Sequence, residues 1–131
     1  NTDKIQYITI QSTGNAIDFG NLEQNTTYNA SSSNSVRGIS GGTGTSPSNK
    51  IDFITIASTG NAQDFGDMVV AKYARSSCSS QTRAIFASGD NVATDCDFVT
   101  LTTLGNAIDF GSLSFGGGYN QGFSNSHGGL M

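Results

Sequence analysis

An all-β fold is predicted by three features of the sequence: its strand-forming residues, its lack of helix formers and a threefold internal repeat. Ile, Val, Thr, Tyr and Phe are frequent and are interrupted by Gly and Asn, a composition typical of short strands joined by turns. Strong helix formers are scarce, and Glu23 is the single glutamate. With 131 residues, the chain is expected to form one domain.

The repeat consists of a main block that ends in Gly-Asn-Ala-x-Asp-Phe-Gly. It occurs at residues 5–20, 51–66 and 96–111, so that its copies start 46 and then 45 residues apart. A weaker block keeps the same phase at residues 33–39, 79–85 and 124–130. Self-similarity at a period of about 45 residues is typical of repeat architectures.

Each repeat unit is predicted to hold four short strands. The main block gives an apolar strand buried on both sides, a Gly-Asn turn, and a second strand through Asp-Phe-Gly. A third strand is expected at residues 28–34, 73–79 and 119–124. A fourth is expected at residues 37–40, 83–87 and 128–131.

Four strands per unit predict either blades of a β-propeller or a threefold domain like a β-trefoil. In the propeller interpretation, residues 28–68 and 73–113 are whole blades within a single repeat domain, 1–131. The remaining blade is split between residues 5–22 and 115–131, as in a propeller whose two chain ends close one blade. The propeller interpretation is favoured by this placement of the ends.

The unit resembles the kelch type of propeller blade. Residues 71–77 read as a polar opening strand, residues 82–89 as an apolar strand that ends in Gly, and residues 97–113 as a hairpin that carries aromatic residues. More narrowly, residues 51–67 are similar to the kelch-like repeat of phage tail-fibre and other virion structural proteins. The chain departs from the kelch pattern because it contains no Trp. The resemblance implies a propeller fold and a structural role in a virion.

Residues that are identical in all three units are expected to serve the fold. The glycines would supply a left-handed turn position, and Asn would cap it or share it. Asp would accept backbone N–H groups, and Phe would pack between units. Ca²⁺ binding by the Asp and Asn side chains is the alternative, but the clustered carboxylates of a calcium loop are missing. These structural repeat positions are Gly14, Asn15, Asp18, Phe19, Gly60, Asn61, Asp64, Phe65, Gly105, Asn106, Asp109 and Phe110.

Candidate ligand-binding residues are expected where units differ or present polar aromatic groups. They are Arg37, Arg83, Tyr28, Tyr73, Tyr119 and His127. Arg37 and Arg83 are equivalent, whereas the third unit has Gly128, and His127 occupies an ordinary strand position that is Val or Thr elsewhere.

Asp95 and Asp97 share one face of a strand, and their charges are expected to be solvated. Cys78 and Cys96 are interpreted as free buried thiols or, in an exported protein, as a disulfide. Two cysteines alone cannot hold a structural zinc ion.

Catalysis has little support in the sequence. His127 is the only histidine, and no nucleophile elbow, phosphate loop or metal-ligand spacing is found, so neither an enzyme nor a cofactor is predicted. Only 12% of the residues are charged and the net charge is −4, which disfavours nucleic acid as a partner. No apolar stretch approaches the length of a membrane span.

Two classes of function remain. One is a structural or adhesive module, extracellular or in a virion, that displays polar loops towards a surface or glycan. The other is a soluble lectin with three similar sites. Three blades are too few for a ring, because propellers have about four to eight. We therefore expect a homodimer that closes a six-bladed ring, contact with neighbouring virion proteins, or a longer propeller chain of which residues 1–131 are a part.

Overall fold

The computed structural model describes residues 2–42 and 48–124, which form ten β-strands in three antiparallel sheets. No helix occurs among these residues, so the predicted all-β class is confirmed. The described residues do not form a closed barrel or propeller. The strands are β1 (Thr2–Tyr7), β2 (Ile17–Thr26), β3 (Ala30–Ser33), β4 (Arg37–Gly41), β5 (Lys50–Thr55), β6 (Gln63–Asp67), β7 (Ser76–Ser79), β8 (Arg83–Ala87), β9 (Asp95–Thr100) and β10 (Ile108–Ser112).

The two four-stranded sheets are built alike. Their strand orders are β3-β4-β5-β6 and β7-β8-β9-β10, and each is a meander of antiparallel neighbours. Shifting β3 and β4 by 46 residues, and β5 and β6 by 45, reproduces the bounds of β7 to β10. The two sheets therefore carry the sequence repeat residue for residue, and they lie within the expected units 28–68 and 73–113.

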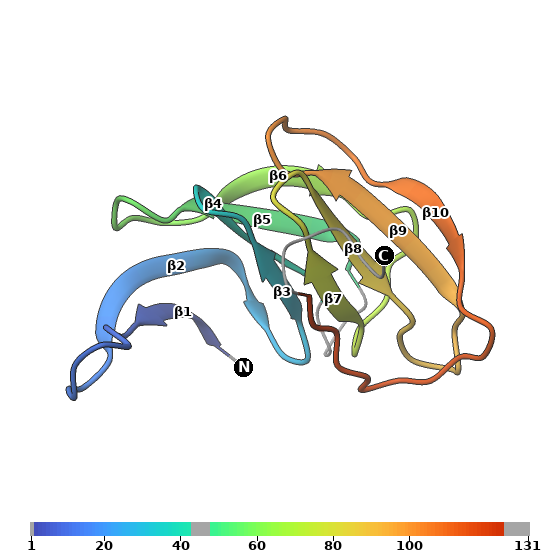
Figure 1. Ribbon diagram of the computed structural model, residues 1–131, viewed down its shortest axis with the longest axis horizontal. Helices are drawn as coiled ribbons and strands as arrows, with labels where there is room; N and C mark the ends of the chain where they lie inside the picture. Colours follow the sequence, from blue (N-terminus) through green and yellow to red (C-terminus); the bar gives the residue numbers. More distant parts are fainter. Residues whose placement is uncertain (1, 43–47, 125–131) are drawn as a thin grey trace.

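The hairpin β1-β2 is equivalent to β5-β6 and β9-β10, but it stands as a two-stranded sheet. In Figure 1 this hairpin lies at the left end of the molecule, β9 and β10 lie at the right end, and β3 to β6 lie between them. Residues 115–124 form no strand, although one was expected from Tyr119. The fourth strand expected at residues 128–131 lies outside the described residues, so the split unit stays a prediction.

A β-bulge recurs in the last strand of each unit. In the last strand of each unit the register shifts between an Asp and a Gly, and the residue between them has no Cα partner. This residue is Phe19 in β2, Phe65 in β6 and Phe110 in β10. A bulge leaves one residue outside the ladder and bends its strand. The repeated Asp-Phe-Gly triplet thus breaks the ladder at the same place in each unit.

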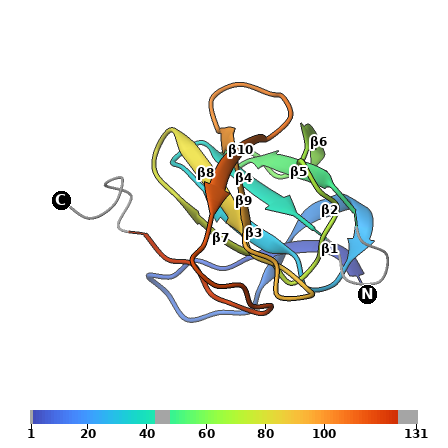
Figure 2. The same cartoon turned by 90° about the vertical axis from the view of Figure 1, so that its right-hand side faces the viewer.

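The core fills the space between the two four-stranded sheets. Phe86 and Val99 of the second sheet, and Leu101 just after β9, are buried with Ile39 and Ile51 of the first sheet in one cluster. Gly41 makes room for this packing, because a Cβ there would lie 3.3 Å from the Phe86 ring. Figure 2 views the molecule from the β10 end, with β10 in front.

The structure also corrects the alignment of the tyrosines. Tyr28, Ala74 and Tyr119 have φ of 57°, 56° and 61°, and they are linked by backbone hydrogen bonds from Ala74 N–H to the Tyr28 carbonyl and from Tyr119 N–H to the Ala74 carbonyl, both 3.1 Å. Ala74 is therefore the equivalent of Tyr28 and Tyr119, and Tyr73 precedes this position by one residue.

Candidate functional site

Neighbouring units meet through a recurring set of three hydrogen bonds, which we call the unit contact. In its first copy, Gly60 N–H donates to the Phe19 carbonyl at 2.8 Å, Ala62 N–H donates to the Asn21 carbonyl at 2.8 Å, and Asn21 N–H donates to Asn61 Oδ1 at 3.1 Å. The Gly-Asn-Ala turn of one unit thus binds the bulged strand of the unit before it.

The second copy of the unit contact joins β6 to the turn before β10. Gly105 N–H donates to the Phe65 carbonyl at 2.9 Å, Ala107 N–H to the Asp67 carbonyl at 2.7 Å, and Asp67 N–H to Asn106 Oδ1 at 3.0 Å. The repeated Asn side chain therefore accepts a bond from the neighbouring unit rather than capping its own turn.

The repeated glycines depart in part from the left-handed turn position that was expected. Gly60 and Gly105 have φ of 158° and 147°, a region favoured by glycine, but Gly14 is not among the residues with positive φ. Phe19 and Phe65 are buried, whereas Phe110 is 54% exposed. Asp64 and Asp109 accept the N–H of the glycine two residues later, at 3.2 and 3.3 Å.

The structure gathers the three candidate tyrosines into one exposed cluster, which we call the tyrosine cluster. The Tyr28 ring lies 5.5 Å from the Tyr119 ring in edge-to-face geometry and 6.4 Å from the Tyr73 ring. Tyr28 and Tyr119 are 59% and 64% exposed. The cluster therefore offers aromatic faces and hydroxyl groups at a single surface.

The candidate arginines lie elsewhere and are engaged within the fold. Arg37 stacks 5.1 Å above the Phe53 ring and donates to the Leu101 carbonyl at 2.8 Å, and Arg83 stacks 4.8 Å above Phe98. Arg37 is the first residue of β4 and Arg83 is the first residue of β8, so both lie at the turn of their hairpin. Tyr28 and Tyr73 precede β3 and β7 and lie at the opposite, open end of the two hairpins. His127 lies outside the described residues.

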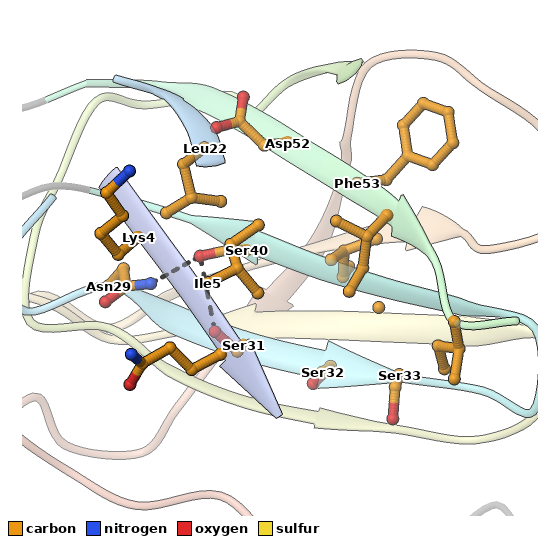
Figure 3. Close-up of a pocket in the computed structure, with 15 residues that line it drawn as sticks. Lys4, Ile5, Leu22, Asn29, Ser31, Ser32, Ser33, Ser40, Asp52 and Phe53 are labelled. Atoms are coloured by element: carbon orange, nitrogen blue, oxygen red, sulfur yellow. Dashed lines mark hydrogen bonds between the residues drawn. The ribbon is translucent and has the colours of Figure 1, made fainter. Parts of the chain in front are cut away.

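A cleft of about 540 Å³ separates the β1-β2 hairpin from the first four-stranded sheet. Its polar side combines Lys4 with the Asn29, Ser31 and Ser40 side chains, and Asn29 Nδ2 donates to Ser40 Oγ at 2.6 Å (Figure 3). Its apolar side includes Leu22, Phe53, Ile54 and Ile56. The cleft can accommodate a group that is both apolar and able to form hydrogen bonds.

Asp52 lines this cleft and is 4% exposed. Its Oδ2 accepts a hydrogen bond from the Glu23 backbone N–H at 3.2 Å, but Oδ1 is buried without a partner. Burial, the largest influence, raises the pKa of the Asp52 carboxyl above its ordinary value of 3.8, and the charge of Glu23 adds to it.

The equivalent carboxylate of the second sheet is paired. Asp97 is 1% exposed and accepts a 2.7 Å hydrogen bond from Arg75, whose other nitrogen donates to Asp95 Oδ2 at 2.7 Å. Lys72 also binds Asp95. Burial alone would raise the pKa of Asp95, but the Lys72 hydrogen bond and the charges of Arg75 and Lys72 lower it. The expectation that both carboxylates are solvated was wrong for Asp97, because the sheet before it covers this face.

Sequence reasoning missed Arg75, Asp52 and the burial of Asp97. The repeat itself contains the signal: positions 52 and 97 are both Asp, whereas position 75 is Arg and its equivalents, 29 and 120, are Asn. Because only one unit has Arg at this position, the sequence could have suggested that Asp97 has a cationic partner and that Asp52 has none. Its burial could not be inferred, because it depends on which face the adjacent sheet covers.

Both cysteines are free thiols, Cys78 half-buried and Cys96 buried. In the described part of the chain, no three His, Cys, Asp or Glu side chains are placed to share a metal ion. Residues 2–42 and 48–124 also include no helix of the length and apolarity needed to cross a membrane.

Comparison of the sequence with models of known protein families finds no match, and comparison with curated proteins finds none.

Proposed function

We propose that the chain is a non-enzymatic structural and adhesive module whose repeated β-units form a frame that presents polar loops to a surface or a glycan. A propeller-like arrangement of the units and a place outside the cell or in a virion, as the kelch-like pattern of residues 51–67 implies, belong to this proposal.

The observation that supports it most is the unit contact, which recurs with the same three hydrogen bonds between different pairs of units. Residues repeated in sequence are used for joining units. The segments that vary between units, among them the loops around the tyrosine cluster, are left for recognition. This arrangement is typical of repeat proteins, in which each unit contacts its neighbours through repeated residues and the loops bind ligands.

The buried charges also fit a structural role. Arg75, Asp97, Asp95 and Lys72 neutralise one another within a single network. The Arg75 and Asp97 side chains are at most 2% exposed, so a substrate would have little access to them.

A soluble lectin is the second candidate, and the tyrosine cluster favours it. Aromatic faces stack on sugar rings while hydroxyl groups bond to sugar hydroxyls. Because the three tyrosines meet at one surface, a lectin built on them would have one site per chain rather than the three similar sites expected from the repeat.

A glycan array probed with the labelled 131-residue chain tests recognition in both proposals. Binding to a defined glycan should weaken at least about tenfold in Tyr28→Ala and Tyr119→Ala, in line with the loss of an aromatic contact of 1.4 kcal/mol or more. Val36→Ala is the matched control, because Val36 is 57% exposed at the opposite end of the β3-β4 hairpin.

The stoichiometry separates the two candidates. One glycan per isolated monomer favours the lectin, whereas binding confined to assembled chains favours the structural module. Absence of binding to glycans and to cell surfaces in every assembly state would contradict adhesion, and turnover of a bound glycan would contradict a non-enzymatic role.

A further inference from the structure

The last bulged strand, β10, presents the surface that its two equivalents bury. Phe19 and Phe65, whose carbonyls bind the turn of the next unit, are 8% and 2% exposed, but Phe110 is 54% exposed. The same contrast separates Met68, which is 2% exposed, from its equivalent Leu113, which is 38% exposed. The Phe position is thus buried in both preceding units and exposed at this end, and the position of Met68 is half-buried at Leu22 and exposed at Leu113.

The backbone around Gly111 leaves the corresponding space open. A Cβ at Gly20 would lie 2.1 Å from the Gly60 carbonyl oxygen, and one at Gly66 would lie 2.6 Å from that of Gly105. A Cβ at Gly111 would meet nothing within 4 Å. At Gly20 and Gly66 a neighbouring turn lies directly against the strand. At Gly111 the same space is free, so a turn could approach there as closely.

The matching turn is exposed at the other end of the molecule. Residues 14–16 have the Gly-Asn-Ala sequence of the two bound turns. The Gly and Asn are exposed in all three turns, but Ala16 is exposed whereas Ala62 and Ala107 of the bound turns are buried and half-buried. In Figure 1 the loop of the β1-β2 hairpin forms the left extremity and β10 lies on the right. The two surfaces therefore cannot meet within one copy as it stands.

The two ends have complementary hydrogen-bonding groups. By sequence equivalence with the bound turns, Gly14 and Ala16 supply two N–H donors and Asn15 a side-chain oxygen once Gly14 adopts the positive φ that Gly60 and Gly105 have and that Gly14 lacks in the free turn. By equivalence with β2 and β6, β10 supplies the Phe110 and Ser112 carbonyls and the Ser112 N–H. Each donor at one end has its acceptor at the other, and the Phe110 ring adds apolar surface.

We propose that β10 binds the Gly14-Asn15-Ala16 turn of a second copy of this chain, so that the unit contact continues from one molecule to the next. The contact joins different surfaces of the two copies, so it is head-to-tail. Such a contact closes into a ring or continues as a chain of copies, depending on its rotation. This inference rests on the geometry of the unit contact and is independent of glycan recognition.

Two variants block the two sides separately. Ala16→Arg places a long charged side chain in the turn, and Phe110→Arg places one on β10. The matched control is Ile108→Arg, because Ile108 is 61% exposed and its equivalents Ile17 and Gln63 are exposed even where the unit contact is formed. The readout is the mass from sedimentation and light scattering over a hundredfold range of concentration, with circular dichroism and thermal unfolding to establish folding.

The wild type and Ile108→Arg should associate to multiples of 13.6 kDa, and both blocked variants should dissociate at least tenfold more readily. An equimolar mixture of Ala16→Arg and Phe110→Arg should form a 1:1 complex, because one molecule keeps a free β10 and the other keeps a free turn. That restoration would not occur if the association were symmetric or non-specific.

Three results would overturn the proposal: a wild type that is monomeric throughout the range, blocked variants that associate as well as the wild type, or a mixture that forms no complex. If Phe110→Arg fails to fold because its ring contact with Phe98 is lost, Asn15→Ala tests the turn side alone, since Asn15 is exposed. Association of Asn15→Ala at full wild-type strength would count against the contact.

Discussion

Arg75 Nη1 donates a hydrogen bond to Asp97 Oδ2 at 2.7 Å, and the two side chains are 0% and 2% exposed. The same guanidinium donates to the Ser88 carbonyl at 3.0 Å and lies 3.4 Å from the Met68 sulfur. It thereby connects β9 to the loop after β8 and to the end of the preceding sheet. Most of its bonding capacity is used within the fold.

Replacing Arg75 should therefore destabilise the protein. Arg75→Met leaves the Asp97 carboxylate buried without its cation, and breaking a buried pair on one side costs about 3–5 kcal/mol. Urea unfolding followed by circular dichroism measures the loss. Arg83→Met is the matched control, since Arg83 is exposed, and should lose less than about 1 kcal/mol.

The double variant Arg75→Met, Asp97→Asn should recover part of the stability lost in Arg75→Met, because it removes the uncompensated charge. Equal stability of the single and double variants would show that Asp97 carries no buried charge penalty.

Asp52 should make the protein less stable as the pH rises. Because burial raises the pKa of Asp52 in the folded state, the folded chain binds a proton more tightly than the unfolded chain does. The stability linked to this proton is fully present below the ordinary value of 3.8 and is lost as the pH rises through the raised pKa.

Asp52→Asn should remove this loss, so that the variant becomes more stable than the wild type as the pH rises above 3.8. Urea midpoints of both proteins between about pH 3 and pH 7 measure the difference. If the difference in urea midpoint between Asp52→Asn and the wild type did not change with pH, the pKa of Asp52 would not be raised in the folded state.

Asp95 should have the opposite effect. Burial by itself raises its pKa, but the Lys72 hydrogen bond and the Arg75 charge outweigh burial and lower it. The stability that Asp95 contributes is present above the ordinary value of 3.8 and is lost as the pH falls through the lowered pKa. In the same urea series, Asp95→Asn should be less stable than the wild type near pH 7 and should approach it in acid. A deficit that grows in acid would be inconsistent with this assignment.

The equivalent glycines of the last strands should tolerate alanine unequally. All three have positive φ, so alanine is strained at each, but at Gly20 and Gly66 the added Cβ would also collide with the neighbouring turn. Gly20→Ala and Gly66→Ala should lose about 1–3 kcal/mol more stability than Gly111→Ala, the typical cost of forced overpacking. Thermal unfolding of dilute, monomeric samples makes the comparison. If all three variants lost the same stability, the loss would come from backbone strain at the glycine and not from collision with the neighbouring turn.

The elements were predictable because strand formation depends on local pattern. The Gly-Asn-Ala-x-Asp-Phe-Gly block located the turns and the last strands, and the repeat spacing gave two sheets of equal construction. The environments of individual residues were less predictable, because they depend on whether another unit lies against them. Phe110 lies in the same Gly-Asn-Ala-x-Asp-Phe-Gly block as Phe65, yet it is 54% exposed whereas Phe65 is 2% exposed.

The site was predictable only in part for the same reason. Tyr28, Tyr73 and Tyr119 were all candidates from the sequence, but the contacts of Tyr28 with Tyr73 and Tyr119 depend on how the units stack, which the pattern does not encode. Arg75 immediately precedes β7, which is not adjacent to the β9 strand of Asp97 in the sheet, so no spacing rule indicates their pairing.

The two free thiols should differ in reactivity. Cys96 is 5% exposed, and burial, outweighing the opposing charge of Arg75, raises the pKa of its thiol above 9.0, so little of the reactive thiolate is present or accessible near neutral pH. Cys78 is half-buried on β7. A disulfide-exchange reagent should therefore modify one thiol of the native chain, and Cys78→Ser should slow that first reaction by about tenfold or more. The unfolded chain should release two equivalents at similar rates. Mass spectrometry of the partly modified protein identifies the labelled residue, and preferential labelling of Cys96 would mean that β9 is more accessible than its packing implies.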